Sequence, residues 1–108
     1  MVLGHVNSSL VTQSGSMYVY SGGLAENTVV DNFASLCVYY GGITTNTIVS
    51  SGGQMYIGDA GIANSTIVSS GASMVAYAAG IVSDTVVSGG SIFVYESASV
   101  DNTIITDD

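Results

Sequence analysis

The chain has 108 residues, of which 47% are hydrophobic and only 7% are charged, and all eight charged side chains are acidic. Because lysine and arginine are absent, no side chain could neutralise nucleic-acid phosphates or anionic lipid headgroups, so we expect no nucleic-acid binding and no basic membrane contact. The net charge of −8 favours solubility and, for a charged partner, a cationic molecule or a divalent ion.

The single cysteine, Cys37, excludes a disulfide within the chain. The first residues, MVLGHVNSSLV, have neither a basic segment nor a long apolar run, so they are not typical of a secretory signal. No stretch approaches the roughly 18 apolar residues that a membrane-spanning helix needs. We expect no membrane insertion by this segment, and a secretion signal would lie outside this sequence unless the export route is unusual.

A motif of one polar residue, threonine and two aliphatic residues recurs along the chain. It appears as NTVV, NTIV, STIV, DTVV and NTII, beginning at Asn27, Asn46, Ser65, Asp84 and Asn102. Successive motifs are 19 residues apart except for a last interval of 18, and Ser9 opens a related motif one interval before the first threonine. Such a fixed period indicates a repeat protein. Its coils are predicted to start near Ser9, Thr28, Thr47, Thr66, Thr85 and Thr103.

Each repeat contains two short runs of β-branched and aromatic residues that are separated by glycine-rich turns. The first run follows the motif, as in residues 28–30 and 47–49, and the second run follows a turn, as in residues 36–39 and 55–57. This pattern predicts strands and turns without helices. A 19-residue unit cannot bury its own apolar face, but parallel units stacked about 4.8 Å apart can. We therefore predict an all-β fold, a single-stranded parallel β-solenoid of about 5.5 coils that forms one repeat domain over residues 1–108.

The alternation of side chains in the second run predicts which residues face inward. The predicted inward pairs are Met17/Val19, Leu36/Val38, Met55/Ile57, Met74/Ala76 and Ile92/Val94. The other set faces outward and contains most of the aromatic residues. The candidate contact surface consists of Tyr18, Tyr20, Tyr39, Tyr56, Tyr77, Phe93 and Tyr95. Cys37 replaces tyrosine in an outward column, and we expect a passive, exposed thiol.

The first run is less clear, because two aliphatic residues are adjacent in it. We predict that the threonines and the second aliphatic residue face inward, as for Thr47 and Val49, and that the threonine hydroxyls bond to one another along the stack. The first aliphatic residue, such as Ile48, then faces outward. The reverse parity would expose the threonines instead. The asparagines before the threonines are expected to form a hydrogen-bonded ladder that Ser65 and Asp84 interrupt.

The outward tyrosines have two interpretations of similar weight. They either stabilise the sheet through aromatic contacts between strands, or they form a surface that binds a glycan or another copy of the chain. The remaining chemistry is sparse. His5 is expected to be solvated, the acidic residues are scattered over the coils, and no serine has a basic partner that would activate it. We predict no catalytic residues, no metal site and no cofactor.

The repeat resembles the strand-loop-strand repeat of AIDA-type autotransporter passengers, most closely at residues 44–57, TTNTIVSSGGQMYI. The resemblance covers roughly residues 8–105. It implies a right-handed parallel β-helix in a bacterial surface adhesin or self-aggregation protein, and some such passengers carry heptoses on serine and threonine. The chain departs from the pattern at Phe33-Ala34, where the glycine turn is missing, and in the 18-residue unit before Gly89.

The favoured hypothesis is a non-enzymatic adhesin or self-association module, extracellular or on the bacterial surface, whose flanks contact another copy, a host glycan or a cell-surface protein. The alternative is a structural stalk or fibre segment that stacks end to end, because no capping element is visible and unpaired strand edges favour addition of further strands. No arrangement of residues supports an enzyme.

Overall fold

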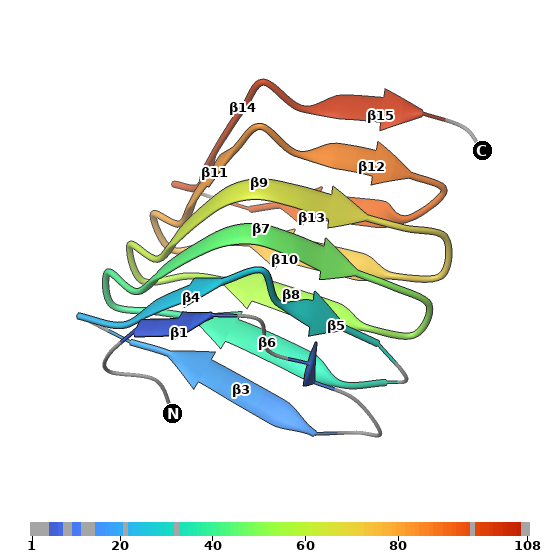
Figure 1. Ribbon diagram of the computed structural model, residues 1–108. Coiled ribbons are helices and arrows are strands. Elements are labelled where there is room, and N and C mark those ends of the chain that lie inside the picture. Colours follow the sequence, from blue (N-terminus) through green and yellow to red (C-terminus); the bar gives the residue numbers. More distant parts are fainter. Residues whose placement is uncertain are drawn as a thin grey trace.

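The computed structural model describes residues 5–7, 10–11, 15–20, 22–31, 33–95 and 97–106. The regular secondary structure of these residues consists entirely of β-strands. The strands wind into stacked coils, coloured from blue at one end to red at the other (Figure 1). The principal dimensions are 35 × 31 × 18 Å. The predicted all-β solenoid is confirmed.

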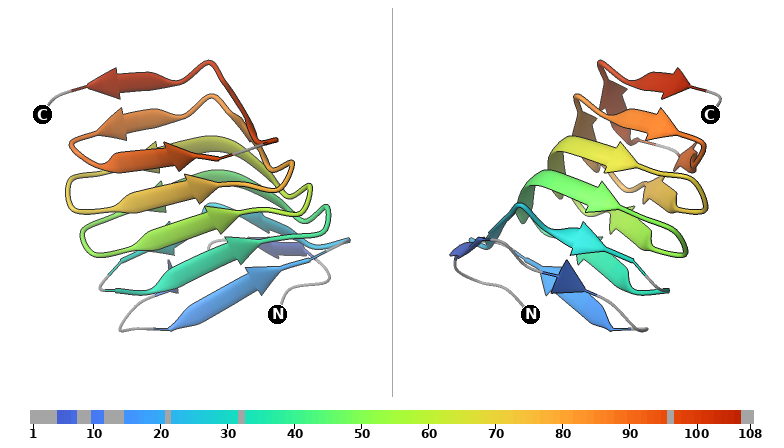
Figure 2. Two further views of the ribbon diagram at one scale, coloured as in Figure 1. Left: turned by 180° about the vertical axis from the view of Figure 1, so that it is seen from behind. Right: turned by 45° about the vertical axis from the view of Figure 1, so that its right-hand side comes forward.

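Two parallel sheets form the walls of the solenoid (Figure 2). The five-stranded sheet runs in the order β13-β10-β8-β6-β3, with one strand from each of five successive coils. Its strands are β3 (Ser16–Val19), β6 (Ser35–Val38), β8 (Gln54–Ile57), β10 (Ser73–Ala76) and β13 (Ser91–Val94).

The ten-stranded sheet bends sharply in each coil, so most coils contribute two short strands to it. These strands are β1 (His5–Asn7), β2 (Leu10–Val11), β4 (Leu24–Glu26), β5 (Val29–Val30), β7 (Ile43–Val49), β9 (Ile62–Val68), β11 (Ile81–Ser83), β12 (Val86–Ser88), β14 (Ser99–Asp101) and β15 (Ile104–Thr106). The long strands β7 and β9 pass through the bend without a break. We call this the bent sheet.

The strand register reproduces the sequence repeat. Thr47 pairs with Thr66 and Leu36 pairs with Met55, both 19 residues apart. The short repeat loses its residue in a turn, because Val86 still pairs with Ile67, whereas Ser91 pairs with Ser73 at an offset of 18. A deletion in a turn leaves the inward and outward faces of both strands unchanged.

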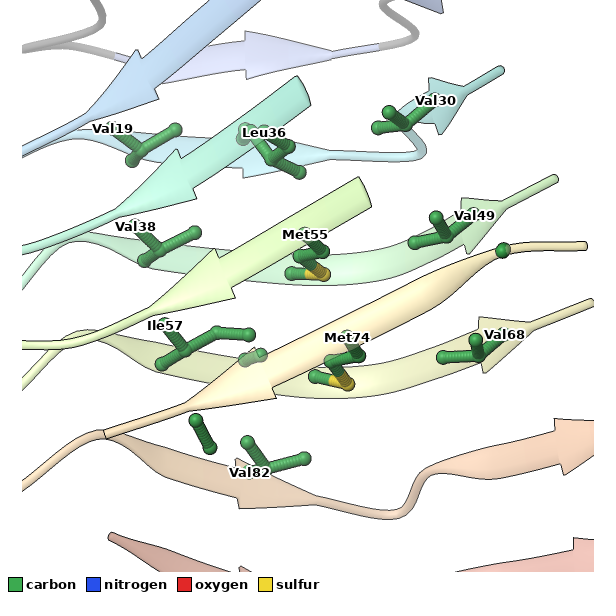
Figure 3. Close-up of a cluster of buried hydrophobic side chains, with 14 of the residues drawn as sticks. Val19, Val30, Leu36, Val38, Val49, Met55, Ile57, Val68, Met74 and Val82 are labelled. Carbon is green, nitrogen blue, oxygen red and sulfur yellow. The ribbon is translucent and has the colours of Figure 1, made fainter. Parts of the chain in front are cut away.

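The core lies between the two sheets and has the predicted composition. Leu36, Met55 and Met74 of the five-stranded sheet are fully buried opposite the fully buried Val49 and Val68 of the bent sheet (Figure 3). The motif threonines Thr28, Thr47, Thr66 and Thr85 are also fully buried, so the predicted parity of the first run is confirmed.

The last strand of the five-stranded sheet departs from the prediction. Val94 was predicted to be a core residue, but 49% of its surface is exposed. It pairs with the fully buried Ala76 on one side only, because β13 is at the edge of the sheet and no described strand covers its other side. A side chain at this edge lacks the next coil that covers the equivalent residue in the central coils.

The predicted hydrogen bonding among the buried threonines is wrong. The Oγ1 atoms of Thr28, Thr47, Thr66 and Thr85 have no hydrogen-bond partner, and neither has that of Thr44. Parallel strands in register place equivalent atoms about 4.8 Å apart, which exceeds the reach of an O–H···O hydrogen bond. The threonines are therefore retained at an energetic cost rather than held by a hydroxyl ladder.

We predict that Thr47→Val stabilises the protein by about 1 kcal/mol, because it removes an unpaired buried hydroxyl while keeping a β-branched side chain of similar shape. Thr47→Ser is the matched control. It keeps the hydroxyl and loses a methyl group, so it should destabilise by about 0.8 kcal/mol. Urea unfolding followed by circular dichroism measures both, and a destabilised Thr47→Val variant would contradict the prediction.

In five successive coils, from Asn27 to Asn102, the bend is formed by one residue in the left-handed conformation. Its φ angle is 55° at Asn27, 56° at Asn46 and Ser65, 54° at Asp84 and 51° at Asn102. Asparagine and aspartate tolerate this conformation better than most residues, which explains why they recur before the threonine. The expectation that Asp84 interrupts a ladder is wrong at this point, because its Oδ1 accepts a hydrogen bond of 3.2 Å from Asn102 Nδ2.

The missing glycine at Phe33 does not alter the turn. Phe33 has a φ of 65°, in the same left-handed region as Gly52 and Gly71 at the equivalent positions of the next two coils. Its side chain is exposed, so a bulky residue causes no clash there. The neighbouring coils impose the turn on a residue that would not select it by itself.

Candidate functional site

The aromatic residues gather on the outer side of the five-stranded sheet. We define the aromatic face as Tyr18, Tyr20, Tyr39, Tyr40, Tyr56, Tyr77, Phe93 and Tyr95. The ring centroids of Tyr20 and Tyr39 are 6.2 Å apart and stacked, and those of Tyr39 and Tyr77 are 6.1 Å apart and edge-on. All seven residues of the predicted contact surface lie on this face, in its strands or directly after them. The surface itself remains a prediction.

In the three central coils, a large side chain in one column of this face is paired with a small one in the other. Coils with a small residue in the first column, Cys37 or Val75, have tyrosine in the second, and the coil with Tyr56 in the first has Gly58 in the second. The missing side chain at Gly58 lets the Tyr77 ring cross that coil, since a Cβ there would lie 2.8 Å from the ring. The Tyr77 hydroxyl then donates a hydrogen bond of 2.6 Å to the Tyr39 hydroxyl, two coils away.

This packing changes the expected state of Cys37. It was predicted to be exposed, but only 7% of its surface is accessible. Its side chain does point to the outer side, as predicted, but the larger tyrosines around it exclude solvent. Burial raises the pKa of the Cys37 thiol, and its hydrogen bond with Tyr39 opposes the effect. Burial, followed by the hydrogen bond with Tyr77, raises the pKa of the Tyr39 hydroxyl.

We predict that Cys37 reacts slowly with a thiol reagent in the folded protein and at the ordinary rate after unfolding, because both burial and a raised pKa suppress the thiolate. The same shift makes the folded protein bind its thiol proton more tightly than the unfolded chain does. Stability from this group is therefore present below the ordinary thiol pKa and is lost as the pH rises above it. Equal rates in native buffer and in denaturant would contradict the prediction.

A shallow hollow of about 640 Å³ lies on the aromatic face. Tyr18, Tyr56, Tyr77 and Tyr95 line it together with the smaller Cys37 and Val75. Its rim carries exposed rings, with Tyr95 60% exposed. The sequence prediction missed Tyr40, which is 59% exposed and makes edge-on contacts with Tyr20 and Tyr39. The sequence did contain a signal for an exposed ring at Tyr40, because this residue follows the outward Tyr39 and stands at a glycine turn.

A second hollow of about 470 Å³ lies on the outer side of the bent sheet, where the strands turn. We call it the corner groove. One wall is polar, with Asn27, Asn46, Ser65 and Asp84 from successive coils, and the other is aliphatic, with Val29, Ile48, Ile67 and Val86. The outward aliphatic column was predicted from the sequence. The sequence did not predict that this aliphatic column and the polar column would line one groove. The bend that brings the two columns together depends on the left-handed corner residues.

Few groups with reactive or metal-binding chemistry are close together. The part of the chain that the structure describes contains no cluster of three or more histidine, cysteine, aspartate or glutamate residues. His5 belongs to β1 by its backbone, and the prediction about its side chain falls outside what the structure describes. No helix among the described residues is long and apolar enough to cross a membrane.

Known proteins with a similar structure or sequence support the solenoid fold. The chain matches the crystal structure of a TibA fragment hyper-glycosylated by TibC, with a TM-score of 0.71 and 22% sequence identity over 82% of this chain. It spans 41% of that fragment. No curated protein sequence matches the chain. Residues 11–72, more than half of the chain, match the family model described as adhesin of bacterial autotransporter system, probable stalk. With its solenoid fold and its repeat, the chain belongs to this family of autotransporter adhesins.

Proposed function

We propose that this chain is a non-enzymatic part of an extracellular adhesin passenger, that residues 1–108 form one repeat domain, and that the aromatic face makes its contacts. The observation that carries the proposal is the hollow of about 640 Å³ on that face, bordered by exposed aromatic rings. Monomeric proteins seldom leave a contiguous aromatic surface in water unless it serves as a contact.

The aromatic face divides into two parts with different expected roles. Tyr39 and Tyr77 are half-buried and hydrogen-bonded to each other, so they support the sheet. Tyr40 and Tyr95 are more exposed and carry rings whose burial by a partner would contribute binding energy. The expected partner is a second copy of the chain, a cell-surface glycan or a cell-surface protein.

Substitution of the exposed rings tests the proposal. We expect the double variant Tyr40→Ser, Tyr95→Ser to reduce self-aggregation of coated beads, or their binding to host cells, by about tenfold. Phe33→Ser is the matched control, because Phe33 is the most exposed aromatic residue but lies in a turn away from the aromatic face. Equal adhesion of the double variant and the wild type would contradict the proposal, as would an equal loss in the control.

A second candidate function, a segment of a stalk, is favoured by the surface of the last coil. Val94 is 49% exposed and Ile105 is 68% exposed, although the equivalent residues Ala76 and Val87 of the coil before them are fully or almost fully buried. A further coil would bury both residues and pair the free strand edge. The family description includes the term probable stalk, which agrees with this role.

Electron microscopy and sedimentation over a concentration series test the stalk function. We expect end-to-end assemblies of the wild type and their loss in the double variant Val94→Asp, Ile105→Asp, because unpaired carboxylates at the contact would remain buried at high cost. The variant Tyr40→Ser, Tyr95→Ser should still assemble in this way. A strictly monomeric wild type would exclude end-to-end stacking of this segment.

A further inference from the structure

We propose that the corner groove binds a neutral, extended glycan whose chain runs along the axis of the solenoid. The groove lies on the bent sheet and shares no residue with the hollow of the aromatic face. The proposal therefore goes beyond the contacts assigned to the aromatic face, and either site can be present without the other.

The two walls of the groove match the two kinds of surface on a sugar ring. Amide, hydroxyl and carboxylate groups of Asn46, Ser65 and Asp84 can accept or donate hydrogen bonds to sugar hydroxyls. The aliphatic wall, with Ile48 and Ile67 both exposed to solvent, can pack against the apolar C–H face of the ring. Each coil presents one polar and one aliphatic side chain, so the same pair of contacts is repeated along the groove.

The spacing of the coils favours a glycan over a peptide. Coils stack about 4.8 Å apart, close to the length that one pyranose ring adds to an extended glycan, whereas a peptide advances about 3.4 Å per residue and repeats its side-chain direction only every second residue. A peptide running along the solenoid axis would also find few free backbone amides and carbonyls to bond to, because the backbone groups of the strands already pair between coils. For example, the amide of Ile48 donates a hydrogen bond of 2.8 Å to the carbonyl of Thr28.

The charges select a neutral ligand. Asp84 is the charged side chain that lines the groove, and the whole chain has no lysine or arginine. An anionic glycan would meet repulsion from Asp84 and from the net charge of −8, with no cationic group to offset it. A neutral glycan can donate hydrogen bonds from its hydroxyl groups to the Asp84 carboxylate, and its binding requires no desolvation of a ligand charge.

The test uses the full chain and a panel of neutral, unbranched oligosaccharides built from glucose, mannose or N-acetylglucosamine, with oligogalacturonate as the acidic comparison. We expect titration calorimetry to detect binding of at least one neutral oligosaccharide and none of oligogalacturonate. No binding across the neutral panel would overturn the proposal, as would equal or tighter binding of the acidic chain or of neutral extended peptides.

The double variant Asn46→Gly, Ile48→Thr is designed to keep the fold. Glycine retains the left-handed conformation of residue 46, whose φ is 56°, and threonine retains β-branching at residue 48. We expect this variant to lose binding by about tenfold or more while its circular dichroism spectrum stays unchanged. The matched control Tyr40→Ser, Tyr95→Ser should bind as the wild type does. The opposite result, with loss only in the control, would overturn the groove and assign the glycan to the aromatic face.

Discussion

Replacing Gly61 by alanine is expected to destabilise the protein by about 2–4 kcal/mol, one of the largest effects of a single methyl group in this chain. Gly61 ends the turn between the two sheets, and its Cβ would collide with the backbone carbonyl of Val38 in the previous coil. That carbonyl accepts a hydrogen bond of 3.0 Å from the amide of Gly58. Any shift that relieves the collision therefore weakens the pairing between the two coils.

Gly41→Ala is the control for this prediction. A Cβ at Gly41 would meet nothing within 4 Å, but the φ of 82° is in the left-handed region, so alanine should cost only about 1–2 kcal/mol. The difference between the two variants in free energy of unfolding separates the effect of the collision at Gly61 from the effect of the left-handed backbone conformation at Gly41. Urea unfolding measures both. A Gly61→Ala variant no less stable than Gly41→Ala would show that the coils separate easily at this turn.

The second large effect is expected for Met55→Ala, which should destabilise by about 2–5 kcal/mol. Met55 is fully buried in the central strand of the five-stranded sheet, with Leu36 and Met74 as its register partners in the adjacent coils. Rigid coils on both sides cannot collapse into the space that the side chain leaves, because their backbones are hydrogen-bonded at a fixed spacing.

Met17→Ala is the matched control for the core prediction, because Met17 occupies the same column of the same sheet. It is only partly buried, since β3 is at the edge of the sheet, and its truncation should cost about 1 kcal/mol. Thermal and urea unfolding of both variants would measure the difference. Equal losses would mean that the edge coil contributes as much to stability as the centre does.

The sequence was sufficient to predict the solenoid, because the same motif and the same alternation recur in successive repeats. A departure in one repeat, such as Phe33 in place of glycine, therefore does not obscure the pattern. The spacing of Thr28, Thr47 and Thr66 predicts the register that the strands adopt. Alternation in the second run predicts the core at Leu36 and Met55. Period and alternation are properties of the backbone geometry of a strand, so they can be read without knowledge of long-range contacts.

Contacts between coils decided what the sequence could not. Cys37 lies on the predicted side of its strand but is buried, because rings from neighbouring coils cover it. Val94 follows the core pattern but is exposed, because no described strand lies beyond β13. The threonine hydroxyls have the predicted direction but no partners, because the spacing between strands is too long for a hydrogen bond.

The sequence by itself therefore determined the repeat, the strand faces and the acidic, lysine- and arginine-free surface. The tertiary structure alone decided which outward residues are accessible and where they form hollows. The physical reason is that side-chain direction is a local property, set by the alternation of the strand. Exposure and concavity depend on the sizes of side chains one and two coils away, as Tyr77 shows when it crosses Gly58 to reach Tyr39.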